Sequence, residues 1–177
     1  RGDDNVASQQ NVVPQGDASL VQEVTAGVDE DPLAHGDVLS NVAGIKEKLG
    51  ERPLLRAIHF FEDNKRVEKE AEALRNGDFD TFKAMTVASG YSSYMYNQNV
   101  FSSSAPLSQP VSLALAISEV ILKGKGAWRV HGGGFAGTIQ AFVPDSLLEE
   151  YKNSMEAVFG EGACYVLAIR PFGGAEI

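Results

Sequence analysis

The chain has 177 residues, of which 44% are hydrophobic and 22% are charged, and its formal net charge is −9. These values lie near the averages of globular domains and exclude a wholly disordered chain, a collagen-like chain and a coiled coil. The absence of any run of about 18 apolar residues excludes a membrane-spanning helix, and the acidic balance excludes a basic surface for nucleic acid.

Residues 1–44 form an acidic lead-in or interdomain segment for which we expect little regular structure. Eight of the 24 acidic residues but only Arg1 of the 15 basic ones lie within residues 1–40, and apolar periodicity is weak there. Because the chain begins with Arg1 and its first methionine is Met85, we expect a piece of a longer protein. The single cysteine, Cys164, cannot form an internal disulfide, which suits a cytoplasmic location.

A helical hairpin is predicted at the start of the second part, a domain over residues 45–177. Asn76 and Gly77 indicate the end of the first helix, because glycine readily takes the left-handed conformation found there. Asp78 is a typical first cap of the helix that follows. The apolar residues that we expect on one face of the first helix are Leu54, Ile58, Phe61, Ala71 and Leu74.

A third helix is predicted after a polar stretch. Residues 90–108 indicate a frayed helix end followed by a loop, since they are rich in Ser, Tyr, Asn and Gln. Ser108 is predicted to cap the next helix, with Pro110 in its first turn and Gly124 just past its end. Apolar residues surround this helix on nearly all sides, so we expect it to be buried.

In the last third of the chain the apolar residues recur at every second position, which is typical of β-strands. Residues 128–131 and 138–143 alternate apolar and polar side chains, and residues 163–169 predict a further strand. Between them, Ser146 and Glu149 predict a capping box that opens a helix closed by Gly160. The order of elements predicts an α+β fold, in which a helical hairpin precedes an antiparallel sheet of about four strands covered by helices, as in a ferredoxin-like α/β plait.

The loop between the first two strands is the main candidate site. Four glycines fall within residues 132–137, more than a hairpin turn needs. Such a run indicates close approach of a ligand to the backbone, with N–H groups facing an anion; the alternative is a loose loop or bulge. A phosphate-binding P-loop is excluded because its Gly-Lys-Ser/Thr is missing, and a dinucleotide fingerprint because a strand follows. The candidate residues are Gly132, Gly133, Gly134, Phe135, Ala136 and Gly137, with His131 as a ligand-facing residue or an ordinary strand histidine.

Three stretches resemble one enzyme family. Residues 129–138 (RVHGGGFAGT) resemble the third conserved motif of the GHMP small-molecule kinases, in the form found in galactokinases. Residues 56–67 (RAIHFFEDNKRV) and 73–79 (ALRNGDF) resemble the galactokinase helix upstream of that motif. The stretches occur in the family's order, and the similarity runs from about Ile45 to the C-terminus. The resemblance implies a GHMP-kinase C-terminal fold and the C-terminal half of a galactokinase.

The resemblance also implies an activity for the parent protein. A galactokinase transfers the γ-phosphoryl group of ATP to the anomeric hydroxyl of galactose with the help of Mg²⁺, and the glycine loop would wall its site. The family's sugar motif, ATP loop and catalytic residues lie in the N-terminal half, so we expect no catalytic residue and no metal ligand in this chain. The implied partners are galactose, ATP and the missing N-terminal domain in cis, and a surface cut from that domain predicts self-association. The alternatives are a GHMP kinase for another small sugar or alcohol and a non-catalytic galactokinase-like sugar sensor.

The remaining candidates favour structural roles. Residues 101–106 (FSSSAP) resemble the serines of the family's ATP loop, but no glycine precedes them closely and a proline ends them, so a polar loop is predicted. His59 and Glu62, three residues apart on a helix, are a possible metal pair, with helix packing as the favoured alternative. Arg66 and Glu70 are predicted to pair on a helix face. Cys164 is expected to be an inert core thiol, and the cluster of Tyr91, Tyr94 and Tyr96 to pack against the missing domain.

Overall fold

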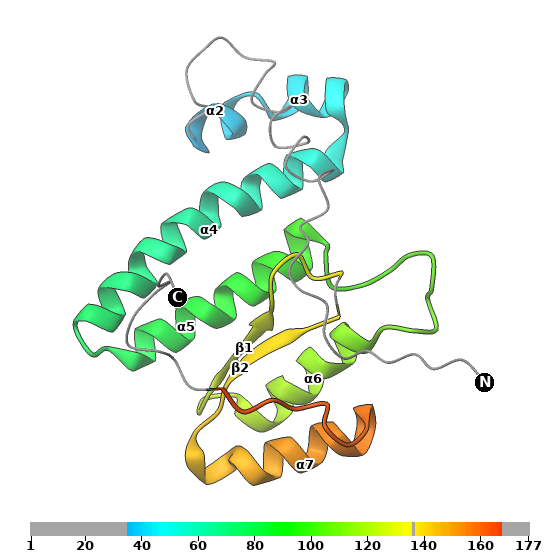
Figure 1. Cartoon of the computed structure of the whole chain (residues 1–177). Helices are drawn as coiled ribbons and strands as arrows, with labels where there is room; N and C mark the ends of the chain where they lie inside the picture. The colour runs from blue at the N-terminus through cyan, green and yellow to red at the C-terminus, as the bar shows by residue number, and fades with distance from the viewer. Residues whose placement is uncertain (1–34, 136, 168–177) are drawn as a thin grey trace, which may run out of the picture.

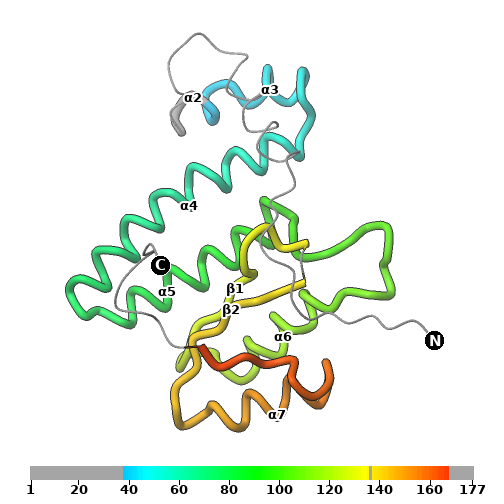
Figure 2. Tube along the Cα trace, viewed as in Figure 1, coloured from blue at the N-terminus to red at the C-terminus, as the bar shows by residue number. Residues whose placement is uncertain are grey.

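The computed structural model describes residues 35–135 and 137–167 and shows a mixed fold of helices around a small sheet. Figures 1 and 2 show the α4–α5 hairpin above the strands and the pair α6 and α7 below them. The elements are α2 (His35–Ser40), α3 (Val42–Leu49), α4 (Glu51–Arg75), α5 (Phe79–Ser92), the π-helix η1 (Ser93–Asn97), α6 (Pro110–Leu122), β1 (Ala127–Val130), β2 (Ile139–Phe142), the 3-10 helix η2 (Asp145–Leu147) and α7 (Leu148–Phe159).

The sheet consists of two antiparallel strands held between helices. Trp128 of β1 lies opposite Ala141 of β2, and Val130 lies opposite Ile139. Helix α5 packs against one side of β1, and helix α6 packs against the other side (Figure 1). Gly90 allows the close approach of α5, since a Cβ there would lie 3.0 Å from the carbonyl oxygen of Trp128. Strand β1 is therefore the buried centre of the domain.

The main hydrophobic core joins α6, α7 and β1. It includes the fully buried Leu122 together with Trp128, Val130 and Met155. Tyr151 of α7 contributes its ring to this core, and its hydroxyl lies 2.8 Å from the buried hydroxyl of Ser118 on α6. This contact satisfies two polar groups that would otherwise be destabilising inside the core. A smaller cluster connects α2, α3 and α4 through Val38, Ile45, Leu54 and Ala57.

The turn between α4 and α5 confirms the predicted hairpin. Helix α4 ends at Arg75, and Gly77 takes the left-handed conformation with φ 69°. The N–H of Asp78 donates to the carbonyl of Ala73 (2.8 Å) and that of Gly77 to Leu74 (3.2 Å), which are the two bonds of a Schellman motif. The Asp78 carboxylate then accepts from the Thr81 N–H at 3.0 Å and caps α5. One short segment thus ends one helix and begins the next.

The Asp78 cap predicts a pH-dependent contribution to stability. The hydrogen bond from the Thr81 N–H lowers the pKa of the Asp78 carboxyl. A carboxylate with a lowered folded pKa stabilises the fold above its unfolded pKa of about 3.9, and that stability is lost as the pH falls through the folded value. We expect Asp78→Ala to lower the melting temperature at pH 7 by about 2–4 °C.

Asp78→Asn is the matched control, because asparagine caps the helix without titrating. This variant should melt like wild type at pH 7 and lose less stability between pH 5 and 3. Calorimetry across this range tests both, and identical pH profiles for wild type and Asp78→Asn would contradict the assignment.

The prediction of about four strands is not confirmed. The described residues contain two strands, and residues 163–167 run without regular structure. The side chains of Tyr165, Val166 and Leu167 are largely exposed there. An apolar stretch becomes a strand only where a sheet edge pairs with its backbone, and within the described residues no edge does so. Residues 168 and 169 of the predicted strand lie outside the described part.

Several helix ends also differ from prediction. Helical structure begins at His35, before Ile45, because the buried Val38 packs against Ile45 and Leu54 and this tertiary contact outweighs weak local periodicity. On α4, Leu74 is exposed and Ala73 is buried in its place. The domain boundary at residues 44 and 45 stays a prediction.

The predicted N-terminal caps of α6 and α7 are wrong. Gln109, not Ser108, is the cap residue of α6, and Pro110 is its first residue as predicted. No capping box forms at Ser146, because that residue already lies in the 3-10 turn that follows Pro144. Gly160 ends α7 with φ 98°, as predicted.

Candidate functional site

The glycine loop connects β1 to β2 at one end of the sheet. The His131 N–H donates to the Thr138 carbonyl (3.1 Å), and the Gly137 N–H donates to the Gly134 carbonyl (3.1 Å). Gly132 (φ 60°), Gly134 (φ 84°) and Gly137 (φ 82°) all have the left-handed conformation that favours glycine. The loop is therefore a defined turn, and the glycine run has a conformational cause.

Two neighbouring glycines in the loop differ in their surroundings. A Cβ on Gly133 would meet no heavy atom within 4 Å, so Gly133 faces open space. A Cβ on Gly134 would clash with the backbone carbonyl of Asn99. The loop thus presents Gly133 outward and seats Gly134 against residue 99.

Asn99 is a site residue that the sequence did not reveal. Its side chain is 2% exposed, and its Nδ2 donates to the Gly133 carbonyl at 3.2 Å. Its Oδ1 is buried and has no hydrogen-bond partner within the described part of the chain. Asn99 lies in the polar stretch 90–108, where nothing in the residue pattern distinguishes it from its neighbours.

The backbone around Asn99 is held from two helices. From α4, Arg56 Nε donates to the Asn97 carbonyl (3.2 Å) and Arg52 donates to the Gln98 carbonyl (3.3 Å). From α6, Ser112 Oγ donates to the Val100 carbonyl (3.1 Å). Charged donors make stronger hydrogen bonds than neutral ones. The segment that supports the glycine loop is therefore fixed by parts of the chain far away in sequence.

The structure places the other predicted loop residues at the surface. His131 is exposed, and Phe135 is 53% exposed. Ala136 lies outside the described residues. The exposed Phe135 ring and the open space at Gly133 keep the loop as the candidate site.

His59 has a structural partner, and the metal pair with Glu62 is not formed. His59 Nδ1 lies 2.9 Å from Ser92 Oγ, and burial lowers the pKa of the imidazole, which favours its neutral form. Glu62 accepts from Lys65 at 2.9 Å. No group of three or more His, Cys, Asp or Glu side chains within the described residues could hold a metal ion.

The predicted pair of Arg66 and Glu70 is also wrong. Arg66 donates to Asp63 at 3.1 Å instead. Burial raises the pKa of Glu70, with the Arg129 charge opposing the shift, and the Oε1 of Glu70 is buried without a partner. The burial of this carboxyl favours its protonated form.

Two further predictions agree with the structure. The segment 101–106 is an irregular loop, in which Ser102 and Ser104 share a hydrogen bond of 2.8 Å and the Gln109 amide binds the Ser102 backbone. Cys164 is half-buried against the main core, and burial raises the pKa of its thiol, which disfavours the reactive thiolate. Neither feature offers catalytic chemistry.

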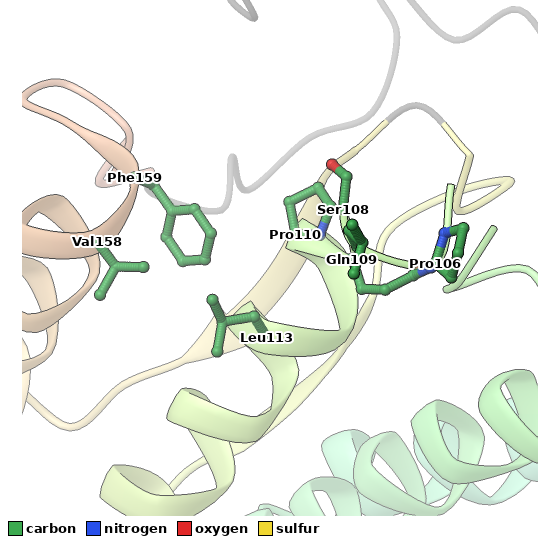
Figure 3. A pocket seen from close by; sticks show the side chains of 8 residues that line it. Pro106, Ser108, Gln109, Pro110, Leu113, Val158 and Phe159 are labelled. Atoms are coloured by element: carbon green, nitrogen blue, oxygen red, sulfur yellow. The ribbon is translucent and has the colours of Figure 1, made fainter. Parts of the chain in front are cut away.

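A shallow hollow of about 410 Å³ lies between α6 and α7 (Figure 3). Apolar side chains of Leu113, Val158 and Phe159 form one side of it, and the segment 106–110 forms the other. Its polar Gln109 amide is already bonded to Ser102 and Ala105. The hollow lacks the convergent polar groups of a small-molecule site and contains no predicted site residue.

The fold of the described residues resembles that of a solved structure. A search of solved structures finds galactokinase from Lactococcus lactis in complex with galactose, with a TM-score of 0.63 and 18% sequence identity. The match covers 89% of this chain and 40% of that chain. The chain therefore has a galactokinase-like fold and spans 40% of the length of that enzyme.

Family models give no match to the chain. Among the described residues, none of the helices combines the length and apolarity needed to cross a bilayer.

Proposed function

We propose that this chain is the C-terminal part of a sugar kinase of the galactokinase type. The observation that carries the proposal is the galactokinase-like fold with a glycine loop whose outward residue, Gly133, has open space around it. The parent protein would transfer the γ-phosphoryl group of ATP to the anomeric hydroxyl of galactose. Phosphoryl transfer depends mainly on positioning and charge neutralisation, and a wall without side chains lets phosphate groups approach the backbone.

This chain would contribute the wall of the site and little of its charge. The described residues offer no cluster of acidic or histidine ligands for Mg²⁺. The nucleotide, the metal and the catalytic groups would be held by the part of the protein upstream. We also propose a cytoplasmic location, and self-association of the chain when it is separated from that part.

Coupled measurement of ATP consumption tests the proposal. A longer protein that contains this chain should consume ATP when galactose is added, and the 177-residue chain alone should not. No turnover with galactose by the folded longer protein would overturn the galactokinase assignment. Turnover with another small sugar or alcohol would favour a different kinase of this family. Sugar binding without turnover would favour a sensor. Turnover by the 177-residue chain alone would contradict the proposal that the catalytic groups lie in the upstream part of the protein.

Gly133→Val tests the loop within the longer protein. We expect turnover to fall at least about tenfold, because the valine side chain would occupy the space that a ligand needs. The melting temperature should stay near the wild-type value, since a Cβ at Gly133 meets no protein atom within 4 Å. Val120→Ala is the control, because Val120 is 84% exposed and distant from the loop in sequence. Unchanged turnover with unchanged stability would refute the role of the loop.

A further inference from the structure

The peptide unit between Gly133 and Gly134 is held by one buried side chain. Its carbonyl accepts from the Asn99 side chain at 3.2 Å. A carbonyl oxygen can only accept, so the Asn99 atom that faces it is the NH₂ group and the other, Oδ1, is directed elsewhere. This contact spans 34 residues and is the side-chain hydrogen bond that ties the loop to the segment after α5.

The contact also sets the direction of an N–H group. In a trans peptide the C=O and N–H of one unit point in opposite directions, and the described residues contain no cis peptide. With the Gly133 carbonyl turned toward the Asn99 NH₂ group, the Gly134 N–H points away from that group, while Gly134 itself is buried against the Asn99 backbone. Among the described residues, no backbone oxygen accepts from this N–H.

Among the residues that the structure describes, the amide of Asn99 pairs through its NH₂ end only. The Oδ1 is buried without a partner, and a buried acceptor without a partner is destabilising. An apolar residue of the same shape would avoid this penalty. The contact that the amide does make, within the described residues, is with the glycine loop.

We propose that Asn99 is a positioning residue of the glycine loop, which fixes the Gly133–Gly134 peptide so that the Gly134 N–H is directed toward an anionic oxygen of the ligand. This inference rests on the proposed function, in which that oxygen belongs to a phosphate group. Backbone N–H groups that are already fixed in position stabilise negative charge that develops in the transition state, because they do not have to reorganise during the reaction. Arg52, Arg56 and Ser112 support the arrangement by holding the carbonyls on either side of Asn99.

Asn99→Leu tests the proposal in two measurements. In the 177-residue chain labelled with ¹⁵N-glycine, we expect the Gly133 and Gly134 amide signals to move and their hydrogen exchange to quicken, while the melting temperature stays close to wild type because the unpaired oxygen is also removed. In the longer protein, kcat should fall about tenfold, which is the effect of one hydrogen bond, while KM for galactose changes less than about twofold. Asn99→Asp is the second variant, in case the leucine disturbs folding; it keeps the shape and loses the donor, so the same changes are expected.

Ser89→Ala is the matched control, because Ser89 lies on α5, is 1% exposed, and has a buried hydroxyl that also lacks a partner among the described residues. It should leave the glycine signals and kcat unchanged. Unmoved Gly133 and Gly134 signals in both Asn99 variants would overturn the positioning role, whatever the activity of the longer protein. Shifted glycine signals with a kcat within twofold of the wild-type value would overturn the link to catalysis. If the wild-type longer protein is inactive, the proposed function is overturned. In that case the glycine signals still decide the role of Asn99.

Discussion

Gly134→Ala is expected to lower the free energy of unfolding of the chain by about 2–5 kcal/mol, the sum of a left-handed backbone penalty and an overpacking penalty. Gly134 has φ 84°, and an added Cβ would meet the backbone carbonyl of Asn99. The carbonyls on either side of Asn99 are hydrogen-bonded to α4 and α6, so this backbone oxygen cannot move aside as the end of a flexible side chain can. Urea denaturation followed by circular dichroism gives the free energy directly.

Gly133→Ala is the control for this substitution at the neighbouring position. Its backbone lies outside the left-handed region and its Cβ would meet nothing within 4 Å, so stability should remain within about 1 kcal/mol of wild type. Equal losses from the two alanines would show that the loop does not pack on Asn99 as described. A large loss from Gly134→Ala alone would establish that the contact is rigid.

Leu122→Ala is expected to be the most damaging of the simple core truncations, with a loss of about 2–5 kcal/mol in the free energy of unfolding. Leu122 is 0% exposed and lies in the core formed by α6, α7 and β1. It also borders the α6–β1 turn, where a Cβ on Gly126 would lie 3.2 Å from its Cδ2. Neighbours held this tightly cannot collapse into the space that the substitution leaves.

Val120→Ala on the same helix separates packing from helix propensity. Val120 is 84% exposed, so its truncation should change the free energy of unfolding by less than about 0.5 kcal/mol. Alanine favours the helix at both positions, so a loss at Leu122 must come from the core. Comparable losses at both positions in the same denaturation experiment would contradict the burial described here.

Local signals in the sequence predicted the elements that depend on local interactions. Asn76, Gly77 and Asp78 predicted the helical hairpin correctly, because a left-handed glycine and a capping carboxylate act within a few residues. The alternation around Trp128 predicted β1, and Pro110 predicted the first turn of α6. The glycine run predicted the loop between the two strands, and three of its glycines have positive φ; the approach of a ligand to that loop stays a prediction.

Elements that depend on distant contacts were not predictable in this way. The strand over residues 163–169 was expected from its apolar pattern, but a strand needs a partner that the pattern does not supply. Helix α2 was missed because it is stabilised by the burial of Val38 against later helices. Asn99 was missed for the same reason, since its contact with Gly133 joins residues 34 positions apart.

The turn at residues 76–78 has a consequence for the order in which the chain folds. A Schellman motif followed directly by a capped helix lets α4 and α5 associate with almost no loop to close, and contacts between neighbouring segments form fastest. The glycine loop, in contrast, reaches its final shape only after α5, α6 and both strands have brought Asn99 beneath it. We therefore expect the hairpin to be structured in the folding transition state and the loop to form afterwards, so that substitutions at Gly134 accelerate unfolding and leave the folding rate nearly unchanged.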